Sequence, residues 1–146
     1  MKTEKGFREE YSFLSNFTYL EKPLCGDGLS FPTVEHFYQA MKTKDEALRK
    51  VISEHPSKGL KKFVLENITI RDDWEDIKLS VMEYGLRWKF SDNNPMLKGK
   101  LLATKGVELV EMNYWRDIFW GVSLQTGEGE NHLGKLLMKI REEILI

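Results

Sequence analysis

The segment from Asp73 to Trp88 carries the longest helical pattern in the chain, and it limits the possible folds more than any other feature. Its apolar residues recur at steps of three and four: Trp74, Ile77, Val81, Tyr84 and Trp88. Such spacing places side chains along one face of an α-helix, and Asp73 stands where a helix cap is expected. We predict a long amphipathic helix here, with this apolar face turned to a protein core.

Shorter helical segments flank this one, and most begin at a residue suited to capping. Thr33, just after Pro32, can cap a first helix within the stretch "FPTVEHFYQAMKTKD" (31–45). The apolar residues of the next helix expected to face inward are Leu48, Val51 and Ile52. The remaining helices are predicted, in chain order, over 45–54, 57–67, 94–106 and 131–144.

Extended structure is predicted in two places. The segment "VELVEM" (107–112) is the best strand candidate, and "FWGVSL" (119–124) can pair beside it. Residues 7–31 have an irregular to extended pattern, with "CGDG" (25–28) as a turn. These patterns predict an α+β fold, predominantly helical with a small β-sheet, formed by residues 1–146 as a single domain.

Composition fits this prediction and narrows the function. The 146 residues are 41% hydrophobic with a formal net charge of −1, which suits one domain with a real core and gives no basic surface for gripping a nucleic-acid backbone. This balanced charge is still compatible with recognition of a single nucleotide in a pocket. Cys25 is the only cysteine, so an internal disulfide and a zinc-finger ligand set are excluded. Without an N-terminal signal region or a run of about 18 apolar residues, we expect a cytoplasmic protein with no membrane partner.

The first predicted helix carries two stripes. Val34, Phe37, Tyr38 and Met41 share one apolar arc, at 100° per residue. Glu35, Gln39 and Lys42 follow one another at i, i+4 and i+7 and form a polar stripe that borders it. Such a stripe can point into a cleft. It can equally be a solvent-exposed face, where such pairs contribute about 0.2–0.5 kcal/mol each.

Several short motifs, taken in order, resemble the NADAR superfamily, which includes YbiA-type N-glycosidases. The motifs span about Phe13 to Arg141 and are "FLSNF", "FPTVEHFYQAMK", "WEDIKLSVMEYGLRWKF", "LLATKGVELVE", "DIFWG" and "GEGENHLGKLLMKIR". Each motif alone is weak evidence for the family, whereas their shared order and spacing are strong evidence. The resemblance implies one mostly helical α+β domain that hydrolyses N-glycosidic bonds of ribose-phosphate compounds.

The same resemblance implies roles for individual residues. Glu35 and Lys42 resemble the family's catalytic pair, and Asn16 in "LSNF" resembles a pocket residue. The other positions expected to bind substrate are Gln39, Trp88, Asn93, Asp117, Trp120 and Asn131. Two departures from the family pattern, "LRW" before "KF" and "SDNN" after it, weaken the assignment of Trp88 and Asn93.

Two chemical routes suit these groups. A carboxylate can stabilise an oxocarbenium-like sugar or activate water, and a neutral lysine can attack the opened sugar's aldehyde carbon to form an imine. Our hypothesis is that Glu35 is the general acid/base and Lys42 the nucleophile. A nearby carboxylate favours the charged amine, so burial would have to outweigh Glu35. Otherwise Lys42 holds a phosphate or orients the sugar.

Several of these residues have an ordinary structural alternative. Trp88 fits the core face of the long helix, Asp117 can be a turn residue or pair with Arg116, and Asn131 can cap its own helix. Trp120 lies in an irregular segment and could stack on a base. The free N–H groups at the start of the last helix could receive a phosphate.

Two further motifs are rejected. "GENHLGKL" (129–136) resembles the start of a phosphate-binding P-loop, but Leu136 stands where Ser or Thr should bind magnesium. His36, His55 and His132 form no metal pattern and are expected to be structural, so we expect hydrolysis without a metal or other cofactor.

The expected substrate is ADP-ribose attached to guanine in nucleic acid, so that the activity would reverse ADP-ribosylation. A ribose-phosphate small molecule, a phosphorylated intermediate of riboflavin synthesis, is the alternative. A module that binds ADP-ribose without cleaving it is a third possibility from a different class.

Overall fold

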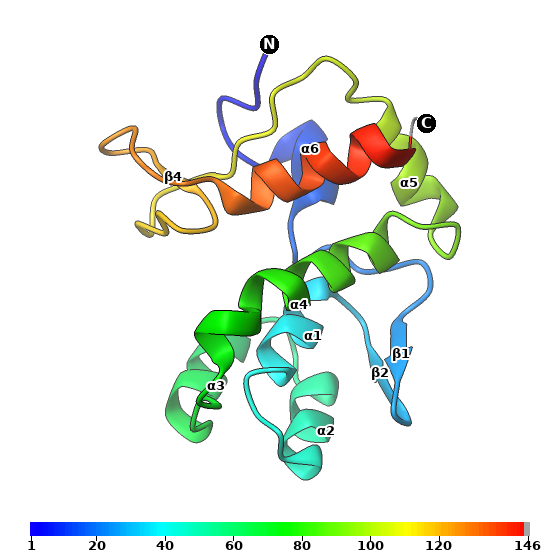
Figure 1. Ribbon diagram of the computed structural model, residues 1–146, viewed down its shortest axis with the longest axis vertical. Coiled ribbons are helices and arrows are strands. Elements are labelled where there is room, and N and C mark those ends of the chain that lie inside the picture. The colour runs from blue at the N-terminus through cyan, green and yellow to red at the C-terminus, as the bar shows by residue number, and fades with distance from the viewer. Residues whose placement is uncertain (145–146) are drawn as a thin grey trace. The chain divides into compact units, whose positions relative to one another are not determined.

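The longest predicted helix is present as α4 (Trp74–Lys89), drawn in green in Figure 1. The computed structural model describes residues 1–144, which form two compact units. One unit consists of residues 16–94, and the other combines residues 1–15 with 95–144. The single domain over 1–146 stays a prediction, whereas the mostly helical α+β class is confirmed. No helix in the described part of the chain is both long and apolar enough to cross a membrane.

The first unit begins its helices at the predicted caps. In α1 (Val34–Ala40), the Thr33 hydroxyl accepts a hydrogen bond from the His36 amide, and in α2 (Glu46–Glu54), the Asp45 carboxylate accepts one from the Leu48 amide. α3 (Leu60–Asn67) starts three residues later than predicted. In α2 the inward residue is Ile52, whereas Val51 is exposed, contrary to the prediction.

Of the apolar face predicted for α4, Trp74 is buried as expected, Ile77, Val81 and Trp88 are half-buried, and Tyr84 is exposed, contrary to the prediction. The buried residues of this helix are Trp74, Met82, Gly85, Leu86 and Lys89, whereas Tyr84 is 57% exposed. The reason lies at Gly85, where an added Cβ would be 3.0 Å from Val34 Cγ1 and 3.3 Å from Phe37 Cδ2. α4 therefore packs closely on α1 at a residue without a side chain, which a pattern of large apolar residues does not detect.

Asp73 occupies the N-cap position of α4, but its side chain makes no capping hydrogen bond. Its two carboxylate oxygens accept instead from Arg71, from Nε at 2.6 Å and from Nη2 at 3.0 Å. The bidentate pair joins the segment before α4 to the start of the helix.

A short hairpin precedes α1. β1 (Leu24–Gly26) pairs antiparallel with β2 (Leu29–Phe31), with Leu24 opposite Phe31. Asp27 and Gly28 form the connection, both with positive φ (51° and 77°), as a two-residue hairpin turn requires. The turn was predicted and the strand pairing was not.

The second unit holds the 3-10 helix η1 (Glu9–Leu14), α5 (Pro95–Leu102) and α6 (His132–Ile144). α5 ends at Leu102, earlier than the predicted Gly106. Side chains from α5, α6 and the segment between them are buried: Leu97, Leu101, Leu109, Leu133, Leu137 and Ile140.

The predicted strand pairing exists in this unit but is short. β3 (Met112–Asn113) and β4 (Val122–Ser123) are parallel and two residues long. The rest of "VELVEM" bonds elsewhere: the Thr3 amide donates to the Glu108 carbonyl, and the Glu108 amide donates to the Met1 carbonyl. The backbone groups that a longer strand would need are thus taken by the N-terminal segment.

Candidate functional site

The polar stripe of α1 is buried, so the solvent-exposed alternative is wrong. Glu35 is 5% exposed and Gln39 is 4% exposed. The Nε2 amide of Gln39 donates a hydrogen bond of 2.5 Å to Oε2 of Glu35. A carboxylate this far from water must have a structural partner or a ligand, and Gln39 accounts for only one of its oxygens.

Asn16 lies beside the start of α1. Its backbone carbonyl accepts a hydrogen bond of 3.0 Å from the Glu35 amide, and its side-chain nitrogen lies 3.6 Å from Met82 Sδ. The "LSNF" motif therefore meets the Glu35 motif in space, and the role of Asn16 as a pocket residue stays a prediction.

Two polar atoms in this cluster have no partner in the described residues. Oδ1 of Asn16 and Oε1 of Gln39 are buried and accept no hydrogen bond. A buried polar group without a hydrogen bond costs about 1–3 kcal/mol of stability, so such groups are rare in native proteins and call for an explanation. Both atoms are acceptors, and they suit the hydroxyl and N–H groups of a sugar or a base.

Lys42 follows the C-terminal end of α1 and is half-buried. Its amide donates to the Gln39 carbonyl at 3.2 Å, and its carbonyl accepts from the Arg71 amide at 2.8 Å, so its backbone is fixed. Its Nζ lies 5.5 Å from the centroid of the Tyr38 ring.

Burial lowers the pKa of Lys42 below that of an ordinary lysine. Glu35 opposes this change by favouring the charged amine, and the like charges of Lys61 and Lys78 add to it. The carboxylate of Glu35 alone would keep the amine charged and so prevent nucleophilic attack. The effect of burial on the pKa of Lys42 is larger, which favours a neutral amine. Lys61 and Lys78 come from α3 and α4, and no sequence pattern linked them to Lys42.

Trp88 and Asn93 lie around the end of α4. The Trp88 indole is half-buried and donates through Nε1 to the Lys22 carbonyl at 3.0 Å, so it is neither a fully buried core residue nor an exposed one. Asn93 donates to Ser91 Oγ through its amide and its side chain. Within the described residues, no hydrogen bond, ion pair or ring contact joins either side chain to Glu35.

Asp117 and Trp120 are joined within the second unit. Oδ1 of Asp117 accepts from the amides of Phe119 (3.1 Å) and Trp120 (2.9 Å), which folds the "DIFWG" segment into a tight loop. The Trp120 ring lies edge-on to Phe119, with centroids 4.9 Å apart. Asp117 is thus a turn residue, and its Oδ2 has no partner in residues 1–144.

Asn131 fastens the start of α6 to the preceding chain. Its Oδ1 accepts from the Glu111 amide, and its Nδ2 donates to the Leu109 carbonyl, both at 3.0 Å. The capping alternative is therefore wrong. The amides of His132 and Leu133 donate to carbonyls of "DIFWG", so these N–H groups are not free for a phosphate, and substrate binding by Asn131 stays a prediction.

His36 is a structural residue. Its ring nitrogens contact Thr33 Oγ1 at 2.6 Å and the His55 carbonyl at 2.7 Å, and burial lowers its pKa. Residues 1–144 contain no group of three or more His, Cys, Asp or Glu side chains arranged to share a metal ion.

Comparison with known proteins gives three kinds of match. A family model described as the NADAR domain matches residues 3–145. N-glycosidase YbiA of Shigella flexneri serotype 5b (strain 8401) is 37% identical over 140 residues, covering 94% of this chain and 84% of that protein. The NMR structure of the Escherichia coli protein YbiA superposes with a TM-score of 0.80 at 35% identity, covering 96% of this chain and 82% of that one.

Longer proteins match as well. Riboflavin biosynthesis protein VVA0006 of Vibrio vulnificus (strain YJ016) is 36% identical over 138 residues, which are 93% of this chain and 36% of that protein. Riboflavin biosynthesis protein PYRR of Zea mays is 39% identical over 140 residues, covering 82% of this chain and 21% of that protein. This chain thus corresponds to a minor part of each.

Proposed function

Because this chain belongs to the NADAR domain family, we propose that it is an N-glycosidase that hydrolyses the bond between a ribose and a nitrogenous base. The observation that carries the proposal is the buried Glu35 carboxylate, hydrogen-bonded to Gln39 and close enough to Lys42 to act on the pKa of its amine, which burial lowers. Relatives named N-glycosidase YbiA support the reaction class.

In the proposed mechanism, Glu35 and Lys42 divide the work. The neutral amine of Lys42 adds to C1 of the opened ribose and forms the Lys42–C1 bond. The C1–N bond to the base then breaks, and the base leaves with a proton from Glu35 as C1 and the Lys42 nitrogen form an imine. Water then adds to the imine carbon, Glu35 takes a proton back, and the Lys42–C1 bond breaks to release the sugar. The lowered pKa of Lys42 supports this route over one in which Lys42 only holds a phosphate.

The cluster around Glu35 suits a ribose. The acceptors without partners on Asn16 and Gln39 can receive hydrogen bonds from sugar hydroxyls or from N–H groups of the base. We propose ADP-ribose attached to guanine in nucleic acid as the substrate, so that the reaction removes ADP-ribosylation.

A second substrate class is favoured by a specific observation. Relatives named riboflavin biosynthesis proteins match this chain over most of its length. A phosphorylated ribosylamine of an aminouracil presents the same ribose and phosphate with a smaller ring. It is the alternative substrate for the same Glu35 and Lys42.

The test is a pair of turnover assays. The protein is incubated with an oligonucleotide bearing ADP-ribosylated guanosine, and separately with the aminouracil ribosylamine phosphate, and free sugar phosphate is measured. We expect turnover of the first substrate, abolished in Glu35→Gln. Turnover of only the second would move the proposal to the small molecule, and binding without turnover of either would leave a non-catalytic ADP-ribose module.

The role of Lys42 has its own measurement. Borohydride reduction during turnover should trap a covalent adduct on Lys42, detected by peptide mass. Lys42→Arg should lose the adduct while keeping a positive charge, which separates imine formation from phosphate binding. Full activity in Lys42→Arg, with no adduct in the wild-type protein, would remove the nucleophile role.

A further inference from the structure

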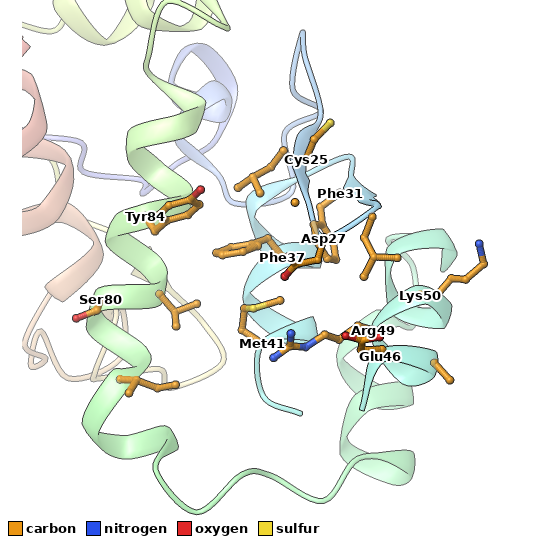
Figure 2. A pocket seen from close by; sticks show the side chains of 16 residues that line it. Cys25, Asp27, Phe31, Phe37, Met41, Glu46, Arg49, Lys50, Ser80 and Tyr84 are labelled. Carbon is orange, nitrogen blue, oxygen red and sulfur yellow. The ribbon is translucent and has the colours of Figure 1, made fainter. Parts of the chain in front are cut away.

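A cavity of about 610 Å³ lies within the unit formed by residues 16–94. Figure 2 shows it between the β1–β2 hairpin, α1, α2 and α4. Volumes of about 300–1,000 Å³ are typical of pockets that hold one small organic molecule. No role in the proposed reaction has been given to this cavity.

The cavity and the polar stripe use opposite faces of α1. Phe37 and Met41 line the cavity, and on a helix they lie about 200° and 240° around from Glu35. The side chains of Glu35, Gln39 and Lys42 are not among its lining residues. The cavity is therefore separate from the candidate catalytic groups, with one short helix as the wall between them.

The walls are mainly aromatic and aliphatic. Phe37 lies edge-on to Phe31 with centroids 5.7 Å apart, and its ring is 5.6 Å from that of Tyr84. In Figure 2, Tyr84 on α4 and Phe37 on α1 point toward one another, and their rings form one continuous side of the cavity. Ile77 and Val81 extend the wall along α4, which explains why part of that helix's predicted core face is only half-buried.

Four charged residues line the cavity: Asp27, Glu46, Arg49 and Lys50. Arg49 extends from α2 toward Met41, whereas Lys50 points away (Figure 2). Nε of Arg49 donates to the Thr43 carbonyl at 2.8 Å, which anchors the guanidinium. Its terminal nitrogens have no hydrogen bond or ion pair among residues 1–144. Asp27 and Glu46 also line the cavity and add two negative charges.

We propose that this cavity is a second binding site, for a flat aromatic molecule that carries one acidic group. The aromatic body packs against the wall that the adjoining rings of Phe37 and Tyr84 form together, where such contacts favour a π-system. The acidic group pairs with the terminal nitrogens of Arg49, a planar fork that matches carboxylate or sulfonate oxygens. Asp27 and Glu46 disfavour a group with two negative charges, so the site selects against phosphate monoesters.

The test compares two dyes with the same ring system. Anilinonaphthalene sulfonate carries one negative charge, and N-phenylnaphthylamine is its neutral counterpart. Both are titrated by fluorescence against the folded full chain. We expect saturable binding of both at one site, with the sulfonate weakened about tenfold in Arg49→Gln and the neutral dye changed less than about twofold, because only the sulfonate loses a charge-assisted hydrogen bond.

Blocking variants locate the dye. Ala47 and Ser80 are exposed residues that line the cavity from α2 and α4, so Ala47→Trp and Ser80→Trp should fill it and abolish binding of both dyes. Lys62→Gln, an exposed position of α3 outside the lining, is the matched control and should change neither. Thermal melts of each variant verify folding, and either blocking variant suffices if the other does not fold.

Three results would overturn the site. They are no saturable binding of either dye to the folded chain, binding unchanged by a folded blocking variant, and equal weakening of both dyes by Arg49→Gln. The glycosidase assay is independent of all three, so failure of the reaction would leave this site standing.

Discussion

The side-chain amide of Gln39 donates a hydrogen bond of 2.5 Å to Oε2 of Glu35, one helical turn earlier in α1. This bond fixes the carboxylate on the face of α1, the helix that ends just before Lys42. Gln39 also leaves its own Oε1 buried without a partner. One residue thus both orients the proposed acid/base and holds an acceptor ready for substrate, which makes it the sharpest single test of the site.

Gln39→Leu should lower activity without lowering stability. The variant removes a hydrogen bond to a charged group, worth about 1.5–3 kcal/mol, so kcat/KM should fall about tenfold to a hundredfold. It also removes a buried acceptor without a partner, which offsets the bond lost by Glu35, and the free energy of unfolding should change by less than about 1 kcal/mol. The measurements are steady-state kinetics and urea unfolding. A loss of activity that merely follows a large loss of stability would contradict the orienting role.

The pH dependence of activity should respond to Lys61. A lysine acts as a nucleophile when neutral, so the rate should rise with pH through the pKa of Lys42, which lies below the ordinary lysine value. The positive charge of Lys61 lowers that pKa further. Lys61→Gln should therefore raise the pKa of Lys42 and move the rising limb of kcat to higher pH, by about half a pH unit.

Lys62→Gln is the matched control, because Lys62 lies beside Lys61 on α3 and is not among the groups that affect Lys42. It should leave the pH profile unchanged. Equal shifts in both variants would indicate a general surface-charge effect rather than one on Lys42.

Stability should rise with pH because of Lys89. This lysine is fully buried, and burial lowers its pKa to about 7. Between about pH 7 and the ordinary lysine pKa, the unfolded chain holds a proton that the folded chain has lost, so the free energy of unfolding increases with pH. The slope can reach about 1.4 kcal/mol per pH unit. Below about pH 7 both states are protonated and this contribution is absent.

Lys89→Met tests this prediction, since it removes the titrating group and keeps an unbranched side chain. Urea unfolding at a series of pH values should show the rise in the wild-type chain and a flatter curve in the variant. Parallel curves would show that Lys89 does not titrate in this range.

Asp117 offers a way to separate structure from substrate binding. Asp117→Ala removes the acceptor for the Phe119 and Trp120 amides and should lower the free energy of unfolding by about 1–2 kcal/mol. Asp117→Asn keeps an oxygen for those amides. If the residue also binds a ribose hydroxyl, Asp117→Asn should raise KM several-fold without lowering the melting temperature. An unchanged KM would limit Asp117 to its role in the loop.

The starts of α1 and α2 could be predicted from the sequence because capping is local. Thr33 and Asp45 each accept a hydrogen bond from an amide three residues later, so the information lies within one turn of the chain. The length of β3 could not be predicted in this way. Its neighbouring backbone groups bond to Met1 and Thr3, about a hundred residues away in the sequence.

The site shows the same division. The order of the motifs predicted which residues carry the chemistry, and their spacing predicted that Glu35, Gln39 and Lys42 lie on one side of the chain. Burial of that face follows from the packing of several elements, and periodicity left the question open. The cavity behind α1 was missed for a related reason: Ile77, Val81 and Tyr84 have the spacing of a core face whether they meet protein or an empty space.

The contact at Gly85 makes the distance between α1 and α4 a heritable variable. A methyl group there would force the side chains of Val34 and Phe37 to yield by a few tenths of an ångström, and both belong to the helix that carries Glu35. Any larger residue at position 85 would therefore press on the helix of the buried carboxylate through its apolar side, without touching a polar group of the candidate site.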